Sequence, residues 1–538
     1  MKFRKMISTL LIIISLGGVL VGCSDNSNDN ASGSFDDDIN VGDNINGSNE
    51  GGHIVVPTEE IDGSLNPVFT GLEKVNLATN ILYTPLYTYE VGNITCGLAN
   101  SVEFKDNKEL TIKLKEGLTW HDGKPITSED VVYTLNLILD KNQGSMLREY
   151  LLVDDKPVEV LKEDDLTIKI ILPVEKAGFL HNISRIAPIP SHVYKNEKLV
   201  SSSEKNKNPI GSGPFKFKEI KEGESITFER FDDYVGGKPK AELVTIKLIP
   251  QDKQEVALEN KEISLMEGNS ELYKKAEKDD SNLQTYTHCA GRLNFLAFNE
   301  NTPSMKNVDF RKALAFTLSR KKLIAAAYGG DEKGAKEAKT ILLPSTDFYY
   351  DGDEIEDYKQ DLDKAKEYLK SSGLSLGVLT LGYNNEENGH KEYASEVANQ
   401  LKALGIDVAV KGYSNKEFQE VLVNRKSECN MYITSYELGG NPEDYKEYFS
   451  GDSFSKQWGY KNEAIDKLWK EAEKEQDNEK RKKIYTDIQM LLAEDAAIYP
   501  IDYERTIMIA LKSLKGIDSA DPRGKILFRD WSKLYIAN

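Results

Sequence analysis

The chain has 538 residues, of which 29% are charged and 39% hydrophobic, and its formal net charge is -19. This composition can bury large cores, so a chain disordered throughout is excluded. Single cores stop growing near roughly 250 to 300 residues, so we expect two or three lobes. The acidic balance argues against a nucleic-acid partner and against long-range attraction to anionic lipid headgroups.

The N-terminus has the layout of an export signal. Basic residues at 2, 4 and 5 precede a mostly apolar stretch over 6–21, which is short for a membrane-spanning helix. The run Leu20-Val21-Gly22-Cys23 resembles a bacterial lipobox, which implies removal of residues 1–22 and diacylation of Cys23. The alternatives are an uncleaved anchor and an ordinary signal peptide. Two acyl chains can hold a soluble domain on a membrane face, so we expect anchoring at the outer face of a Gram-positive-like cytoplasmic membrane.

The segment after the lipobox has the composition of a tether. Residues 24–52 are dominated by Ser, Asn, Asp and Gly and contain no Lys or Arg. Such a segment cannot bury a core, so we interpret 23–52 as an acylated cysteine followed by a flexible tether. The remaining cysteines, Cys96, Cys289 and Cys429, are odd in number, so at least one is unpaired or makes an intermolecular bond.

The folded body mixes strands and helices. Ser128-Glu129-Asp130 predicts a helix start, because acidic residues favour the first turn. A helix from 393 ending at Gly405 precedes a strand at 406–410, which is an α/β signal. The other predicted strands are at 53–56, 110–114, 166–172, 293–298 and 497–503, with hairpin strands after 208 joined at Gly236-Gly237, and the other predicted helices are at 309–328, 361–371, 415–425, 462–475 and 479–494.

Five segments, in order, resemble the oligopeptide- and dipeptide-binding family, the extracellular solute-binding proteins of peptide and nickel ABC transporters. They are Leu65-Asn66-Pro67 and residues 116–140, 208–219, 228–240 and 293–324. The resemblance implies an α/β, two-lobed, periplasmic-binding-protein-like fold with an extra inserted domain and a ligand cleft between the lobes. Hinge closure around the ligand is the expected motion. The implied divisions are domain I at 53–88, 196–289 and 500–538, domain II at 89–195, and domain III at 290–499.

The resemblance also implies where a peptide would lie. In the family the ligand is extended and its backbone pairs with protein main chain, which is strand addition inside a cleft. The strand beginning at Gly291 and the loop from Thr434 to Asn441 match the cleft-lining positions. The predicted ligand-binding residues are Arg292, Leu293, Asn294, Tyr436, Glu437, Leu438, Gly439, Asn441 and Tyr503.

One departure from the family pattern concerns the ligand's amino group. Relatives hold it with an Asp in a motif resembling Trp-x-x-Asp-Tyr-x-Asp-Pro, through a charge-assisted hydrogen bond. Here Leu438 occupies that position when the motif is aligned on Pro442, and Gly439 occupies it when the motif is aligned on Tyr436. Glu437 is the nearest carboxylate that could substitute. The alternative for Glu437 is a solvated loop side chain.

Three further side chains have two interpretations each. Arg292 could fork onto a ligand carboxylate, or it could form a salt bridge with an acidic neighbour. Tyr436 and Tyr503 could offer ring faces and hydroxyls to a peptide. For both tyrosines, core or hinge packing is the favoured alternative.

Catalytic signatures are missing from the sequence. It contains no G-x-S-x-G, no H-E-x-x-H and no cysteine pairs at zinc spacing, so we expect no enzyme, no cofactor and no metal site. The resemblance implies a monomer that captures peptides and delivers them to the permease subunits of an ABC importer. Two alternatives stay open. The fold could bind a non-peptide ligand such as a nickel chelate, for which His288 is the histidine close to the cleft, or it could serve a sensor or surface lipoprotein that is not coupled to transport.

Overall fold

The computed structural model describes strand β1 (Gly18–Gly22) and most of the body. The predicted lipidation site Cys23 and the tether over 24–50 lie outside the described residues. Strand β1 falls within the predicted export signal and pairs antiparallel with β5. The described body comprises residues 51–61, 64–69, 77–90, 92–184, 186–278, 281–329, 332–374, 377–423, 428–451, 458–523 and 527–537.

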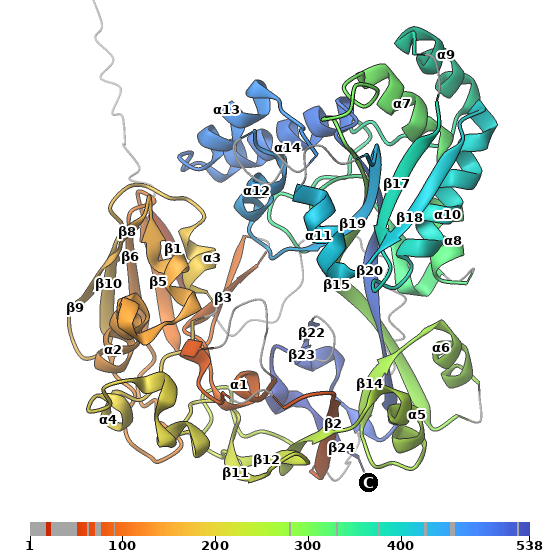
Figure 1. Cartoon of the computed structure of the whole chain (residues 1–538). Helices are drawn as coiled ribbons and strands as arrows, with labels where there is room; N and C mark the ends of the chain where they lie inside the picture. The colour runs from red at the N-terminus through yellow and green to blue at the C-terminus, as the bar shows by residue number, and fades with distance from the viewer. Residues whose placement is uncertain are drawn as a thin grey trace, which may run out of the picture.

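The first sheet lies at the left of Figure 1 and has five strands in the order β1-β5-β6-β10-β9. Its neighbouring strands are antiparallel. Strand β6 (Glu109–Leu114) confirms the prediction at 110–114, and its alternate side chains Leu110, Ile112 and Leu114 are buried, as a period of two requires. The other strands are β5 (Ala99–Lys105), β9 (Glu159–Lys162) and β10 (Thr167–Ile171).

Helix α2 (Ser128–Leu139) packs against this sheet and begins where predicted. The Asp130 carboxylate accepts a hydrogen bond from the N–H of Thr127 at 2.9 Å, which satisfies a donor at the helix start. Val131 and Leu135 are buried against the sheet side of the helix. The helix therefore covers the sheet with the apolar face that the sequence predicts.

The second sheet joins distant parts of the chain. Strands β11, β12 and β13 are antiparallel neighbours, and β2 then pairs with β13 in parallel. Gly236-Gly237 lies in the connection between β12 and β13, as predicted. The strand bounds are β2 (His53–Thr58), β11 (Phe215–Lys221), β12 (Ser225–Arg230) and β13 (Leu243–Leu248).

The third sheet has the order β14-β20-β15-β19-β17-β18, with β16 beside β20, and most of its strands lie in the upper right lobe of Figure 1. Strands β15 and β20 continue from there down to β14 in the lower part of the molecule. Two of its strands are longer than the predicted ones at 293–298 and 497–503, because β15 begins at Leu283 and β20 continues to Leu511. The bounds are β14 (Leu265–Gly268), β15 (Leu283–Phe298), β16 (Ala335–Glu337), β17 (Leu379–Asn384), β18 (Val408–Tyr413), β19 (Met431–Glu437) and β20 (Ile498–Leu511).

Helices cover both faces of this sheet. Alternate residues of β15 belong to different cores: Leu296 and Phe298 pack with α7, α8 and α10, while Phe295 and Ala297 pack with α11, α13 and α14. The predicted helix region 309–328 is split into α7 and α8. The bounds are α7 (Val308–Thr317), α8 (Arg320–Ala327), α9 (Leu362–Ser372), α10 (His390–Leu401), α11 (Asn415–Val423), α13 (Glu463–Ala472) and α14 (Asn478–Glu494).

Shorter elements complete the body. The helices are α1 (Leu77–Leu82), α3 (Phe179–Ile183), α4 (Ser191–Tyr194), α5 (Gln251–Glu259), α6 (Ser270–Ala276) and α12 (Lys446–Phe449). The strands are β3 (Tyr87–Glu90), β4 (Asn93–Cys96), β7 (Leu152–Val153), β8 (Lys156–Pro157), β21 (Leu514–Lys515), β22 (Pro522–Arg523), β23 (Leu527–Phe528) and β24 (Tyr535–Ile536).

Candidate functional site

The two segments predicted to line the cleft are neighbours in the third sheet. Arg292 of β15 lies opposite Glu437 of β19, and Leu293 lies opposite Tyr436. On its other side, Leu293 lies opposite Tyr503 of β20. Leu438, Gly439 and Asn441 follow the end of β19. The structure therefore brings most of the predicted ligand residues together where β19 ends beside the middle of β15 and β20.

Three of these side chains point into a core. Leu293, Tyr436 and Tyr503 are buried. The Tyr436 hydroxyl donates to the carbonyl of Ile341, and the Tyr503 hydroxyl donates to the carbonyl of Thr340 at 3.0 Å. The two tyrosines thus hold the loop at 340–341 in place, within the lobe that contains α7–α14, which we call the second lobe. This geometry matches the packing interpretation, and what these residues can offer to a ligand is their main chain.

Loop residues after β19 are also tied to their own lobe. The carbonyl of Gly439 accepts from the hydroxyl of Thr346 at 3.4 Å, and the side chain of Asn441 accepts from the N–H of Glu443 at 3.1 Å. Leu438 is half-buried against the core. The loop is therefore held in place beside the strand end.

Arg292 is surrounded by carboxylates. Its guanidinium nitrogens lie 2.5 Å from Glu387, 3.5 Å from Glu437 and 3.5 Å from Glu504, and one of them donates to the Ser435 hydroxyl at 2.7 Å. The Arg292 side chain is 18% exposed, whereas that of Glu437 is 63% exposed. A ligand carboxylate would have to compete with these partners for Arg292, while Glu437 is open to solvent.

Sequence reasoning missed two buried titratable groups beside this cluster. Asp502 is fully buried, accepts from Asn294 at 3.1 Å and from the Tyr393 hydroxyl at 2.6 Å, and burial raises its pKa to about 7. His390 is 1% exposed, and neither of its ring nitrogens has a hydrogen-bond partner among the described residues. Burial, aided by the charge of Arg292, lowers the pKa of His390 to about 4. A lone Asp and a lone His carry no local sequence signal, so only the fold reveals them.

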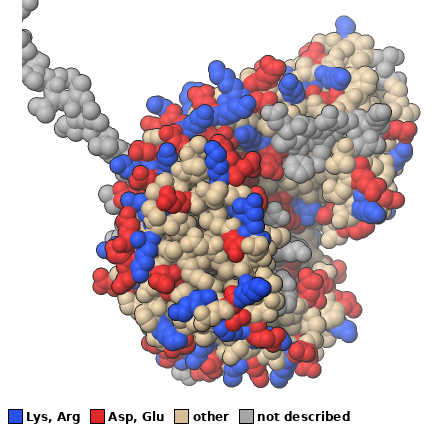
Figure 2. Space-filling view, turned by 60° about the vertical axis from the view of Figure 1, so that its left-hand side comes forward, with Lys and Arg blue, Asp and Glu red and all other residues tan. Residues whose placement is uncertain are grey.

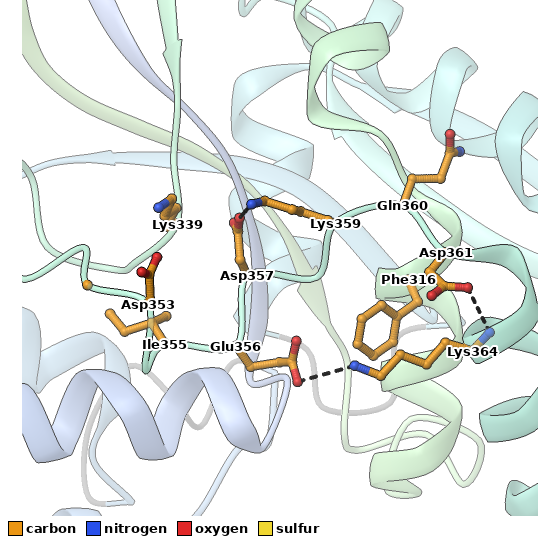
Figure 3. Close-up of a pocket in the computed structure, with 11 residues that line it drawn as sticks. Phe316, Lys339, Asp353, Ile355, Glu356, Asp357, Lys359, Gln360, Asp361 and Lys364 are labelled. Carbon is orange, nitrogen blue, oxygen red and sulfur yellow. Dashed lines mark hydrogen bonds and ion pairs between the residues drawn. The ribbon is translucent and has the colours of Figure 1, made fainter.

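A separate pocket of about 330 Å³ opens on the second lobe, away from all the predicted ligand residues. Figure 3 shows the acidic and basic side chains on its wall. Lys364 lies 3.6 Å from Glu356, and Lys359 lies 3.6 Å from Asp357. Since its charged groups pair with one another, this pocket is not our candidate site. Its lining includes Phe316, Lys339, Asp353, Ile355, Gln360 and Asp361.

The surface supports a cleft between lobes. Figure 2 shows acidic and basic side chains interspersed over one face, with a recess between the upper right part of the molecule and the body below it.

In the described part of the chain, no group of three or more His, Cys, Asp or Glu is placed to hold a metal ion. Within the same residues, no helix has the length and apolar character needed to cross a bilayer. Cys289 is half-buried and Cys429 is buried.

Two lobes joined by paired strands, with a recess between them, define a solute-binding protein of the two-lobed type. The chain belongs to the bacterial extracellular solute-binding proteins, family 5, since the model described as the middle part of that family matches residues 93–460. The match confirms the predicted family, and the solved structures that follow confirm the predicted fold class.

Solved structures agree with this assignment. AppA from Clostridium difficile is 47% identical, with a TM-score of 0.82, over 90% of this chain and 100% of that one. The ABC transporter substrate-binding protein CtaP from Listeria monocytogenes is 36% identical, with a TM-score of 0.84, over 91% and 100%. The oligopeptide-binding protein AppA from Bacillus subtilis, in complex with a nonapeptide, is 26% identical, with a TM-score of 0.67, over 91% and 100%.

Proposed function

We propose that this protein captures peptides between its lobes and delivers them to an ABC permease. The observation that carries the proposal is an open strand edge on β19. Strand β17 pairs with β19 only up to Ile433, whereas β15 pairs with it as far as Glu437. Among the described residues, no strand pairs with the β17 side of Thr434–Glu437.

This edge suits an extended peptide. In an antiparallel strand, alternate residues turn their N–H and C=O groups away from the paired neighbour. Along Thr434–Glu437 those groups point away from β15, toward the edge where β17 no longer pairs with β19. A peptide backbone can add at this edge as a further strand. Main-chain pairing gives affinity with little selection on side chains. The buried tyrosine side chains of this region do not obstruct such pairing.

Glu437 is our candidate for the ligand's amino group, in place of the missing family Asp. Its exposed carboxylate stands at the end of the open edge. Replacing it in the variant Glu437→Gln should weaken binding of a peptide with a free amino group by at least about tenfold, because a charge-assisted hydrogen bond contributes roughly 1.5–3 kcal/mol. Binding is measured by calorimetry. N-acetylation of the peptide should abolish the difference between the variant and the wild type.

The matched control for this substitution is Glu428→Gln. Glu428 lies on the same lobe, is 87% exposed and pairs with Lys411 at 3.6 Å. Its loss should leave peptide affinity within twofold of wild type. Equal small effects of the two substitutions would show that the Glu437 carboxylate takes no part in peptide binding. Arg292 remains a candidate for a ligand carboxylate, in exchange for one of its present partners.

The membrane attachment and the domain divisions are part of the same proposal. A diacylated Cys23 and a tether up to residue 52 would hold the binding body close to its permease. Domain I would comprise 53–88, 196–289 and 500–538, domain II 89–195 and domain III 290–499. Support comes from the sheets, because the second sheet unites β2 with β11–β13 and the first sheet draws its strands after β1 from 99–171.

Native mass spectrometry of the purified body, residues 53–538, tests the ligand class. A ladder of peptide masses on the protein is the expected result and would give the length range directly. A metal or a non-peptide mass, such as a nickel chelate, would overturn the peptide proposal.

A further inference from the structure

Domain II contacts the second lobe directly, at a place separate from the strands that join the lobes. Two carboxylates of the second lobe accept main-chain N–H groups of domain II. Asp347 accepts from Gly92 at 2.8 Å, and Glu443 accepts from Gly178 at 2.9 Å. In Figure 1, α3, which Gly178 precedes, accordingly lies beside α12, which follows Glu443.

The first contact is enclosed by other groups. His181 of domain II places its Nε2 3.1 Å from Asp347, whose side chain is only 3% exposed. The ring of Tyr89 packs edge-on against His181 at 4.5 Å. Gly92 sits in the turn between β3 and β4 with φ of +75°, a conformation that presents its N–H and that side-chain-bearing residues rarely adopt. The Asp347 carboxylate is therefore enclosed by the Gly92 N–H and the His181 ring.

The second contact, between Glu443 and Gly178, is tightly packed. Glu443 and Arg481 are each 8% exposed, and their charged groups lie 3.8 Å apart. A Cβ atom on Gly178 would lie 2.5 Å from the Glu443 carboxyl carbon. Since Gly178 has φ of -74°, its backbone would tolerate alanine, and only the approach of Glu443 demands glycine. Position 178 therefore requires glycine because Glu443, from the second lobe, packs directly against it.

Two further hydrogen bonds extend the contact between domain II and the second lobe to the turn between α13 and α14. The N–H of Ala177 donates to the carbonyl of Glu473 at 3.1 Å. The side-chain amide of Asn107 donates to the carbonyl of Glu475 at 3.4 Å. The contact thus joins three segments of domain II to three segments of the second lobe.

We propose that Gly92, Gly178 and His181, with Asp347 and Glu443, form an interlobe latch that gates exchange of the peptide. The inference rests on the proposed function, because the gate acts on the peptide cleft. Glu443 follows the open edge of β19 by six residues, and the N–H of Asp347 donates to Gly440 in the intervening loop at 2.9 Å. Separating domain II from the second lobe breaks both carboxylate contacts, so the latch slows the opening that releases ligand.

Hydrogen–deuterium exchange and peptide release test the latch together. The variant Gly178→Ala should push Glu443 away. The segments 88–94 and 174–182 should then exchange at least fivefold faster, and a fluorescent nonapeptide should dissociate at least fivefold faster. Gly377→Ala is the matched control, because Gly377 has no heavy atom within 4 Å of its added Cβ. The second variant, Asp347→Asn, removes the charge facing His181 at constant shape and should change both readouts in the same direction.

The outcomes separate the two proposals. Unchanged exchange at both segments in both variants would overturn the latch, whatever the protein binds. Faster exchange with an unchanged release rate would overturn the gating role. Faster exchange in a protein that binds no peptide at all would support the contact but reject both the peptide cleft and its gate. Faster exchange with faster release, against wild-type behaviour of Gly377→Ala, supports the inference.

Discussion

Replacing Arg311 with methionine is expected to destabilise the second lobe by about 3–5 kcal/mol, the usual cost of breaking a buried ion pair. The Arg311 side chain is 4% exposed. It donates to the carbonyls of Met305 at 2.7 Å, Ala496 at 3.1 Å and Asp495 at 2.6 Å, and lies 3.2 Å from the Glu300 carboxylate. Methionine fills the space but leaves these acceptors unsatisfied. Denaturant unfolding measures the loss.

Two companion variants sharpen this prediction. Arg230→Met removes a guanidinium that pairs with the exposed Asp232 at 2.8 Å, and it should cost less than about 1 kcal/mol. Adding Glu300→Gln to Arg311→Met should recover part of the loss, because no buried carboxylate then remains uncompensated. Tryptophan fluorescence is a suitable probe, since the buried Trp458 belongs to this lobe. Equal costs for the two arginine substitutions would contradict the argument.

The second large effect concerns Asp502 and pH. Burial raises the pKa of Asp502 from an ordinary value of 3.8 to about 7. Between these values the folded protein binds the proton more tightly than the unfolded chain does. The stabilisation is therefore fully present below about pH 4 and is lost as the pH rises through 7. We expect the free energy of unfolding to fall over this range by roughly 2–4 kcal/mol from this group.

The variant Asp502→Asn should flatten that fall, because the amide keeps the shape without ionising. Part of the slope should remain, since burial also raises the pKa of Glu300 to about 7. Asp363→Asn, at a side chain that is 97% exposed, is the control and should leave the profile unchanged. Unfolding curves at several pH values between 4 and 8 provide the test. A wild-type slope in Asp502→Asn would exclude Asp502 as its source.

Strands and helices that bury one face were predictable from the sequence, because their apolar residues recur with the period of that face. Residues 110–114 alternate because one face of β6 is packed, and the helix from Ser128 begins where an acidic first turn and an apolar face coincide. The first half of β15, residues 283–292, is largely polar and lacks that alternation. It is a strand because β20 pairs with it, and such tertiary pairing has no local signature.

The candidate site was predictable by segment but not by side chain. The family pattern located Arg292 and Glu437, but only the register between β15 and β19 places them opposite each other. For Tyr436 and Tyr503 the sequence favours core packing over ligand contact without deciding between them, and in the structure both side chains are buried. Gly178 looks like any other loop glycine in the sequence, because the carboxylate that it accommodates is contributed 265 residues later.

The third sheet has a consequence for how the protein is made. Strand β14 at 265–268 and the first half of β15 have β20 at 498–511 as their shared neighbour. Neither strand can complete its hydrogen bonding until that late segment has been synthesised. Contacts this distant in sequence form slowly. A chain halted before residue 498 would leave the edges of β14 and β15 bare, ready to pair with another unfinished chain.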